Sequence, residues 1–245
     1  MKKEILIIAT VFTAVAFISC SKEKMGTMQL RSTDEITTAS SSNSRTIDPL
    51  TVNLEGWFAF DNNLKDKTGK LPDGIASTRG IIYGTDRKGV AKGAIYFDSS
   101  YGVTLKLVPQ QTHTSLSVWV KYASQMQGAI SIIGAFDDGP KLAQAQNIFI
   151  GTVESQPNGA SGGYSGLMNN SWHHVVVTYD GSILKMYVDN VVKVSMSWAG
   201  TITPRQVTYN LAHLWPTDFW KGYMDDLRFY SRTLSASDVS ALYNQ

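Results

Sequence analysis

The amino-acid sequence predicts an all-β fold, a two-sheet antiparallel β-sandwich with one short C-terminal helix. Apolar and polar residues alternate in short runs, and residues typical of turns separate these runs. Asp180-Gly181 lies between two such runs, 175–179 and 183–188, and Asp-Gly is the strongest short signal of a hairpin. Before the C-terminal segment, no stretch of residues 51–245 sustains the period of a helix.

The expected strands are short and follow one another along the chain. They cover residues 80–83, 94–97, 103–107, 116–122, 130–133, 148–153, 175–179, 183–188, 191–196, 207–214 and 223–230. The helix comes after the last strand. Ser235, with Asp238 three residues later, is a variant of the capping box that begins helices. Val239 and Leu242 then give a helix of barely two turns one apolar stripe.

The last strand contains a carboxylate that does not fit its alternation. One face carries Tyr223, Leu227 and Phe229, and the other carries Asp226, Arg228 and Tyr230. By the same alternation Asp225 points toward the core, where an unpaired carboxylate is too costly to bury. We therefore expect Asp225 to have a cation, a cluster of backbone N–H groups, or exposure at the end of the strand.

The segment from Gly222 to Tyr243 closely resembles the C-terminal signature of laminin-G-like domains, which are jelly rolls related to concanavalin A-type lectins and glucanases. Earlier segments resemble further strands of that family, in the family's order. They are residues 56–66, 93–98, 115–121, 172–182 and 183–189. The resemblance covers residues 51–245 and implies a concanavalin A-like jelly roll. These motifs are specific for the fold and not for a ligand.

The first 50 residues are expected to export and tether this domain. Basic residues at the start precede an apolar run, 5–18, that is too short to span a bilayer, so residues 1–20 are interpreted as a signal peptide. Residues 17–20 resemble a lipoprotein lipobox, which predicts lipidation of Cys20; a free thiol is the alternative. Residues 21–50, rich in Ser, Thr and Asn, are interpreted as a flexible tether.

This organisation predicts a protein of the cell envelope, anchored by lipid to the outer membrane on its surface or periplasmic side. Membrane contact is expected through the lipid alone. Residues 51–245 contain 16 Lys and Arg against 15 Asp and Glu, so the expected domain is nearly neutral. A nucleic-acid partner is not expected, because such binders present a basic face.

Catalysis is not expected either. Glycosidases with this fold carry a strand motif Glu-x-Asp-x-Glu or Glu-x-Asp-x-x-Glu, whose alternation places the acidic side chains on one face. Beyond the tether the chain has only two glutamates, Glu55 and Glu154, and neither belongs to such a motif. Phosphate-binding loops and zinc-spaced Cys or His pairs are also absent from the sequence.

Calcium is the candidate cofactor that the resemblance implies. It places Asp61 beside the Asp225-Asp226 pair, and Asn63 could add an amide oxygen from the next loop. Carboxylate and amide oxygens are ligands that calcium prefers. In the alternative interpretation, Asp61 and Asp66 only form turns and Asp225 accepts backbone N–H bonds.

Aromatic residues provide the candidate ligand-binding groups. Trp215 and Trp220 lie in an expected loop together with Asp218. Aromatic rings stack on the C–H faces of sugars while carboxylates bind sugar hydroxyl groups, so these three residues suit a glycan site. Trp220 could instead fill the end of the sandwich. Trp119 and Trp172 are expected in the core, where the family places buried residues.

These observations predict a non-catalytic, lectin-like module that binds a glycan or polysaccharide, with calcium as a candidate cofactor. The alternative is a protein interaction, adhesion or structural module that contacts other envelope proteins. A third interpretation, a glycoside hydrolase of the same fold, is disfavoured by the missing motif. The expectation of a glycan ligand rests on analogy between folds, and one fold hosts many functions.

Overall fold

The computed structural model describes residues 48–77, 80–123, 129–135, 139–146, 148–155, 158–213 and 219–245. They belong to a compact unit that runs from Thr46 to Gln245. The expected signal peptide, Cys20 and almost all of the tether lie outside the described residues, so these interpretations remain predictions. Within the described part of the chain, no helix is both long and apolar enough to cross a membrane.

The described residues form β-strands, with two short helices near the ends of the unit. The helices are η1 (Pro49–Thr51), a 3₁₀ turn, and α1 (Ala236–Tyr243). The strands are β1 (Leu54–Phe58), β2 (Ile75–Ala76), β3 (Ile82–Gly84), β4 (Ala94–Asp98), β5 (Val103–Gln110), β6 (Thr114–Tyr122), β7 (Ala129–Gly134), β8 (Gly139–Ala145), β9 (Ile148–Ser155), β10 (Asn158–Ser165), β11 (Trp172–Tyr179), β12 (Ile183–Val188), β13 (Val191–Ser197), β14 (Arg205–Leu211) and β15 (Lys221–Tyr230).

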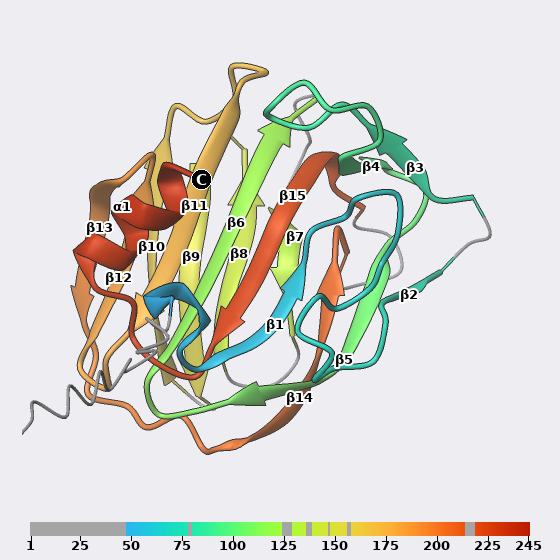
Figure 1. Ribbon diagram of the computed structural model, residues 1–245. Coiled ribbons are helices and arrows are strands. Elements are labelled where there is room, and N and C mark those ends of the chain that lie inside the picture. The colour runs from blue at the N-terminus through green and yellow to red at the C-terminus, as the bar shows by residue number, and fades with distance from the viewer. Residues whose placement is uncertain are drawn as a thin grey trace, which may run out of the picture. The chain divides into compact units, whose positions relative to one another are not determined.

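The strands form two antiparallel sheets that stack as a sandwich (Figure 1). Sheet A has the order β13-β12-β11-β6-β15-β4-β3, and β1 also pairs with β15. Sheet B has the order β10-β9-β8-β7-β14-β5-β2. Neighbours in each sheet are often distant in sequence, which requires long crossovers between the sheets. The predicted fold class is therefore confirmed.

The main core lies between the two sheets. Its largest fully buried side chains include Phe58, Phe97, Tyr209, Phe229 and Trp220. Alternate residues of sheet A point inward to this core and outward to the other face of the sheet. On the strand β11, for example, Val175 and Val177 join the core whereas Val176 does not. Sheet A thus has an outer face on which further elements can pack.

The helix α1 covers part of this outer face (Figure 1). A second hydrophobic cluster joins it to sheet A and η1 and contains Leu50, Leu54, Val176, Tyr187, Tyr230, Leu234, Val239 and Leu242. The predicted capping box is confirmed, because Ser235 and Asp238 each accept a backbone N–H bond from the other. The predicted apolar stripe of Val239 and Leu242 is buried.

Three strands of sheet B were not predicted: the two-residue β2 and the longer β8 and β10. The strand β8 begins at Gly139-Pro140, and β10 has the sequence Asn-Gly-Ala-Ser-Gly-Gly-Tyr-Ser, which lacks apolar alternation. The glycines of β10 have a packing reason. A Cβ atom at Gly162 would lie less than 3.0 Å from the side chain of Val194 on β13, so the two edge strands approach closely only because that side chain is missing.

Candidate functional site

The strand β15 contains a β-bulge at its pair of aspartates. Asp225 lies opposite Trp119 of β6, and three residues later Arg228 lies opposite Ser117, only two residues away on β6. One extra residue is therefore inserted in β15, and Asp226 has a positive φ of 47°. The bulge changes which residues face outward.

Strict alternation predicted that Asp225 points into the core between the sheets, but the structure does not place it there. Met224, Leu227 and Phe229 occupy that core. The extra residue lets the consecutive Asp225 and Asp226 both line a cleft on the outer face of sheet A. The prediction of the face was therefore wrong. The prediction that Asp225 needs compensation is confirmed, because it is only 3% exposed and pairs with a cation.

That cation is Arg87, which comes from the turn between β3 and β4. Its guanidinium donates from Nη1 to Asp225 and from Nη2 to Asp226, the latter at 2.6 Å. The preceding Asp86 holds the turn by accepting backbone N–H bonds from Lys88 at 2.8 Å and Val90 at 2.7 Å. The Arg87 side chain is only 8% exposed, so its guanidinium forms largely buried, charge-assisted hydrogen bonds with both aspartate side chains.

Asp226 has further partners from two other residues. The indole Nε1–H of Trp57 donates to it at 2.7 Å, and Nη2 of Arg228 lies 3.7 Å away. The guanidinium of Arg228 also lies over the ring of Trp57, 4.3 Å from its centroid. The guanidinium of Arg87 lies in the same way over Trp119, at 4.8 Å. Aromatic rings and cations therefore alternate around the two carboxylates.

The two neighbouring carboxylates have pKa values that shift in opposite directions. Burial, reinforced by the charge of Asp226, raises the pKa of Asp225 to about 7 despite Arg87. Burial acts on Asp226 in the same sense. There, however, Arg228, the Trp57 hydrogen bond and Arg87 together outweigh it and lower the pKa. Asp226 is therefore the better stabilised anion.

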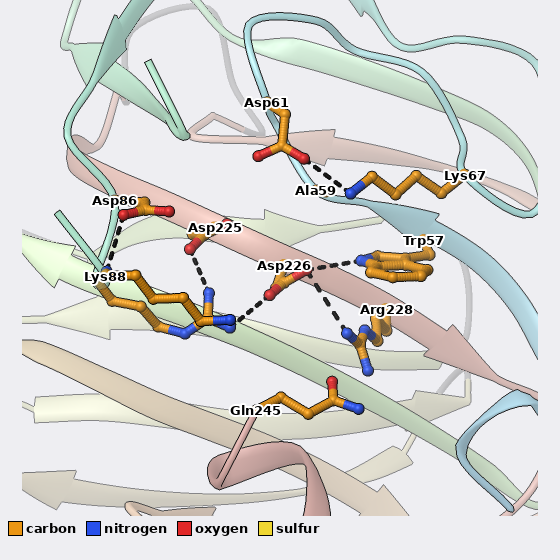
Figure 2. A pocket seen from close by; sticks show the side chains of 11 residues that line it. Trp57, Ala59, Asp61, Lys67, Asp86, Lys88, Asp225, Asp226, Arg228 and Gln245 are labelled. Carbon is orange, nitrogen blue, oxygen red and sulfur yellow. Dashed lines mark hydrogen bonds and ion pairs between the residues drawn. The ribbon is translucent and has the colours of Figure 1, made fainter. Parts of the chain in front are cut away.

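Figure 2 shows these side chains around a cleft of about 430 Å³ on the outer face of sheet A. Its lining combines one indole with several carboxylates, guanidinium groups and lysines. The lining residues are Trp57, Ala59, Asp61, Lys67, Asp86, Arg87, Lys88, Asp225, Asp226, Arg228 and Gln245. Acids and bases are equal in number in this list, so the cleft presents hydrogen-bonding groups without a strong net charge.

The loop after β1 forms one rim of the cleft. Asp61 and Lys67 form an exposed ion pair at 2.8 Å. Asn63 does not line the cleft, because its amide group closes its own loop: Nδ2 donates to the carbonyl of Asp61, and Oδ1 accepts from the backbone of Lys65. The buried Asp66 accepts four backbone N–H bonds, so its turn-forming role is confirmed.

The predicted calcium ligands do not form a site that fits a hard cation. Arg87 binds both Asp225 and Asp226, and Lys67 binds Asp61, so each carboxylate already has a cationic partner. In the parts of the chain that the structure describes, no group of three or more His, Cys, Asp or Glu side chains could hold a metal ion. A divalent cation would have to displace Arg87. Calcium binding remains an untested prediction.

The structure corrects the predicted positions of three tryptophans. Trp220 is fully buried beside Phe97, with ring centroids 6.2 Å apart, so it fills the sandwich and cannot stack on a ligand at the surface. Conversely, Trp119 and Trp172 are half-buried on the outer face of sheet A and not in the core. Trp215 and Asp218 lie outside the described residues, and their role in ligand binding remains a prediction.

His174 lies beside Trp119 on the outer face of sheet A, because the two residues pair between β11 and β6. Its ring stacks on that of Trp119 at 5.1 Å, and Nε2 lies 2.9 Å from the hydroxyl of Ser117. Burial, together with Arg87 and Arg228, lowers the pKa of His174 to about 3. Its burial, at 1% exposure, and its low pKa are those of a neutral structural histidine.

Sequence reasoning missed Arg87 and Trp57 as site residues. Arg87 lies 138 residues before Asp225, and no local pattern links them. For Trp57 the strand alternation was an available signal. Trp57 carries an N–H donor and is adjacent to Phe58, which occupies the core. Adjacent residues of a strand point to opposite faces, so Trp57 had to lie on the outer face or in solvent.

Comparisons with known proteins agree with this fold. A family model described as the concanavalin A-like lectin/glucanases superfamily matches residues 97–240. The comparison with curated proteins gave no match. Among solved structures, domain 4 of AbnA, a GH43 extracellular arabinanase from Geobacillus stearothermophilus in complex with arabinotriose, is 23% identical. The match covers 78% of this chain and 98% of that one, with a TM-score of 0.64.

Two neurotoxin structures are also similar. The botulinum neurotoxin serotype D binding domain is 15% identical, with a TM-score of 0.65. A structure of botulinum neurotoxin type C, whose cell entry is described as dependent on interaction with two ganglioside molecules, is 15% identical, with a TM-score of 0.62. Each match covers 78% of this chain but about half of the toxin chain (50% and 51%). At these identities the solved structures support the fold alone.

The family assignment rests on the matched model, which spans more than half of the 245 residues. The chain belongs to the concanavalin A-like lectin/glucanase superfamily.

Proposed function

We propose that the chain is a non-catalytic carbohydrate-binding module whose ligand occupies the cleft beside Asp225 and Asp226. The observation that carries this proposal is the composition of the cleft, in which an indole ring lies among fixed carboxylate, guanidinium and ammonium groups. A sugar needs both kinds of partner. Its C–H face packs on an aromatic ring, and its hydroxyl groups donate to carboxylates and accept from cations.

The inner part of the cleft is rigid before any ligand arrives. Arg87, Asp226, Trp57 and Arg228 hold one another through hydrogen bonds, ion pairs and ring contacts. A ligand that binds there does not have to order these side chains, which reduces the entropic cost of binding. The cleft is open and shallow, and we expect affinities between mM and μM, about 4 to 8 kcal/mol.

The outer rim supplies side chains that can adapt to hydroxyl groups. Lys67 and Asp61 are 43% and 52% exposed, and an exposed ion pair of this kind contributes only about 0 to 1 kcal/mol to stability. Lys88 is exposed on the opposite turn. These groups can exchange their present partners for ligand hydroxyls at little cost, so we assign them the first contacts with the sugar.

The similar structures add support for a glycan ligand. The arabinanase domain was solved with arabinotriose, and the type C toxin structure is described with ganglioside molecules. Catalysis is not part of the proposal, because the glycosidase motif is absent from the sequence and Glu55 is engaged by Ser231 at 2.5 Å. We further propose that Cys20 and the tether hold this module at the outer membrane of the cell envelope.

A glycan array with the full-length chain tests the proposal, once with calcium and once with chelator. The array should include arabino-oligosaccharides and ganglioside oligosaccharides. We expect Lys67→Ala to weaken binding about tenfold without lowering the melting temperature, because Lys67 lines the cleft. Lys65→Ala is the matched control, since Lys65 is exposed on the same loop but does not line the cleft.

Each outcome of the array distinguishes between the cleft, another binding site and the absence of glycan binding. Binding that is lost in Lys67→Ala and kept in Lys65→Ala supports the cleft, and insensitivity to chelator supports Arg87 as the cation of the site. Equal binding by both variants would contradict a site in the cleft and favour the predicted ligand residues Trp215 and Asp218. If folded protein binds no glycan, the carbohydrate proposal is wrong and an interaction with envelope proteins becomes the function to test.

A further inference from the structure

Three aromatic side chains and one lysine form a row across the outer face of sheet A. The row consists of Tyr96 on β4, Tyr223 on β15, Lys121 on β6 and Trp172 on β11. The strand register places them side by side: Tyr223 pairs with Tyr96 on one side and with Lys121 on the other, and Lys121 pairs with Trp172. The row therefore runs at right angles to the strands, over four neighbouring strands.

The rings contact one another along this row. The centroids of Tyr96 and Tyr223 lie 4.5 Å apart, and those of Tyr223 and Trp172 lie 6.2 Å apart. Nζ of Lys121 lies over the ring of Tyr223, 5.3 Å from its centroid. Gly84 on β3 makes room for this ring, because a Cβ atom there would lie less than 3.0 Å from it.

Core packing does not explain the row. Neither of the two hydrophobic clusters formed by the described residues includes Tyr96, Tyr223 or Trp172, and each of these side chains is half-buried. A single exposed aromatic ring needs no explanation, whereas a contiguous, accessible apolar patch marks an interaction site. The row is thus an accessible platform built on rigid strands.

The row continues directly into the cleft. Moving two residues along β15 and β6, from Tyr223 and Lys121, leads to Asp225 and Trp119, which pair with each other. Asp225 lines the cleft, and Arg87 of the cleft lies over Trp119. With neighbouring strands about 4.8 Å apart, three steps between strands make the row roughly 14 Å long. Row and cleft form one surface that is larger than a single sugar requires.

We propose that this row is a stacking subsite for a neutral polysaccharide chain, so that the module binds an extended stretch of polymer and not only a terminal sugar. The inference rests on the proposed function of the cleft. The negative face of each ring attracts the polarised C–H groups of a sugar ring, and successive rings take successive sugars. Single-stranded nucleic acid also stacks on aromatic rings but requires a basic groove, whereas this domain is nearly neutral.

Affinity electrophoresis of the full-length chain tests this subsite. The gels contain arabinan, xylan, mixed-linkage glucan or galactomannan, and calorimetry uses the trisaccharide of any polysaccharide that retards the protein. We expect Tyr223→Leu and Trp172→Leu each to weaken polysaccharide binding roughly 3- to 10-fold, the worth of one aromatic contact. Trisaccharide binding in the cleft should change less than about twofold by the same scale.

Two variants serve as controls. Tyr223→Phe keeps the ring and should bind the polysaccharide as the wild type does, which separates stacking from the hydroxyl group. Tyr164→Leu removes a half-buried tyrosine of β10 that also has a lysine over its ring, but on sheet B, and should have no effect. Circular dichroism verifies that each variant is folded.

The possible failures are distinguishable. If Tyr223→Leu and Trp172→Leu bind polysaccharide like the wild type while Lys67→Ala binds weakly, the row has no role and the cleft proposal stands. If no polysaccharide retards the wild type and no glycan binds on the array, both proposals fail. Row-dependent binding of oligo-dT without any binding of polysaccharide would overturn the choice of ligand.

Discussion

Replacing Asp225 by asparagine removes a buried carboxylate whose pKa is raised from 3.8 to about 7. Asparagine has the same shape and can still accept one hydrogen bond from Arg87, but it cannot ionise. In the unfolded chain an aspartate is ionised above pH 3.8, whereas folded Asp225 stays protonated until about pH 7. Between these values the folded state holds a proton that the unfolded state has lost.

The sign of the pH dependence follows from this difference in bound protons. Raising the pH removes protons and therefore favours the unfolded state, so the wild type loses stability between about pH 4 and pH 7 through this group. The whole rise in pKa corresponds to about 4 kcal/mol, because a tenfold change in an ionisation constant is worth about 1.4 kcal/mol. About 2 to 3 kcal/mol of this falls between pH 5 and pH 8.

Urea denaturation of both proteins at several pH values between 5 and 8 measures the effect. We expect the unfolding free energy of Asp225→Asn, relative to the wild type, to increase by about 2 to 3 kcal/mol over this range. Asp98→Asn is the control: a hydrogen bond from Ser100 lowers the pKa of Asp98, so Asp98 is ionised in both states throughout. A difference between Asp225→Asn and the wild type that does not change with pH would refute the reasoning.

Three further predictions concern the framework of the site. Asp66→Ala should lower the unfolding free energy by about 3 kcal/mol in urea denaturation, because four backbone N–H groups lose their acceptor; a loss below about 1 kcal/mol would contradict this. Gly222→Ala should cost about 1 to 3 kcal/mol, since its Cβ would collide with Trp220, whereas Gly80→Ala meets no atom within 4 Å and should leave the melting temperature unchanged. Burial lowers the pKa of His174 to about 3, so the NMR shifts of its ring should not change between pH 8 and pH 5. A charged imidazole above pH 5 would contradict this and show that the ring is solvated. Because the unfolded chain takes up this proton first, the folded state loses stability through His174 as the pH falls below 6.5.

The sequence predicted most strands because a strand with one buried face must alternate with period two. The sequence pattern fails where contacts with other strands override it. On β10, Gly and Ser replace the apolar residues, since close approach to β13 leaves no space for side chains at Gly162. On β15, the bulge shifts the alternation at Asp226, and a bulge depends on the register with β6 and not on local propensity.

The site was predicted only in part. Asp225 was singled out by its conflict with the strand pattern and Asp226 by the family resemblance, and both line the cleft. Asp61 lines it as well, but paired with Lys67, while Asn63 closes its own loop. The nature of the compensating cation was not predictable, because a guanidinium and a metal ion satisfy the same electrostatic requirement.

Sequence alone determined the fold class, the C-terminal helix with its cap, the neutrality of the domain and the need of Asp225 for a cation, backbone N–H groups or exposure. Each depends on interactions between residues that are close in the chain, or on composition. Only the tertiary structure decided that Arg87 is that cation, that Trp220 is buried, and that Tyr96, Tyr223 and Trp172 meet. These facts depend on strand order and register, which bring together residues that are distant in the chain, and no local pattern encodes such a pairing.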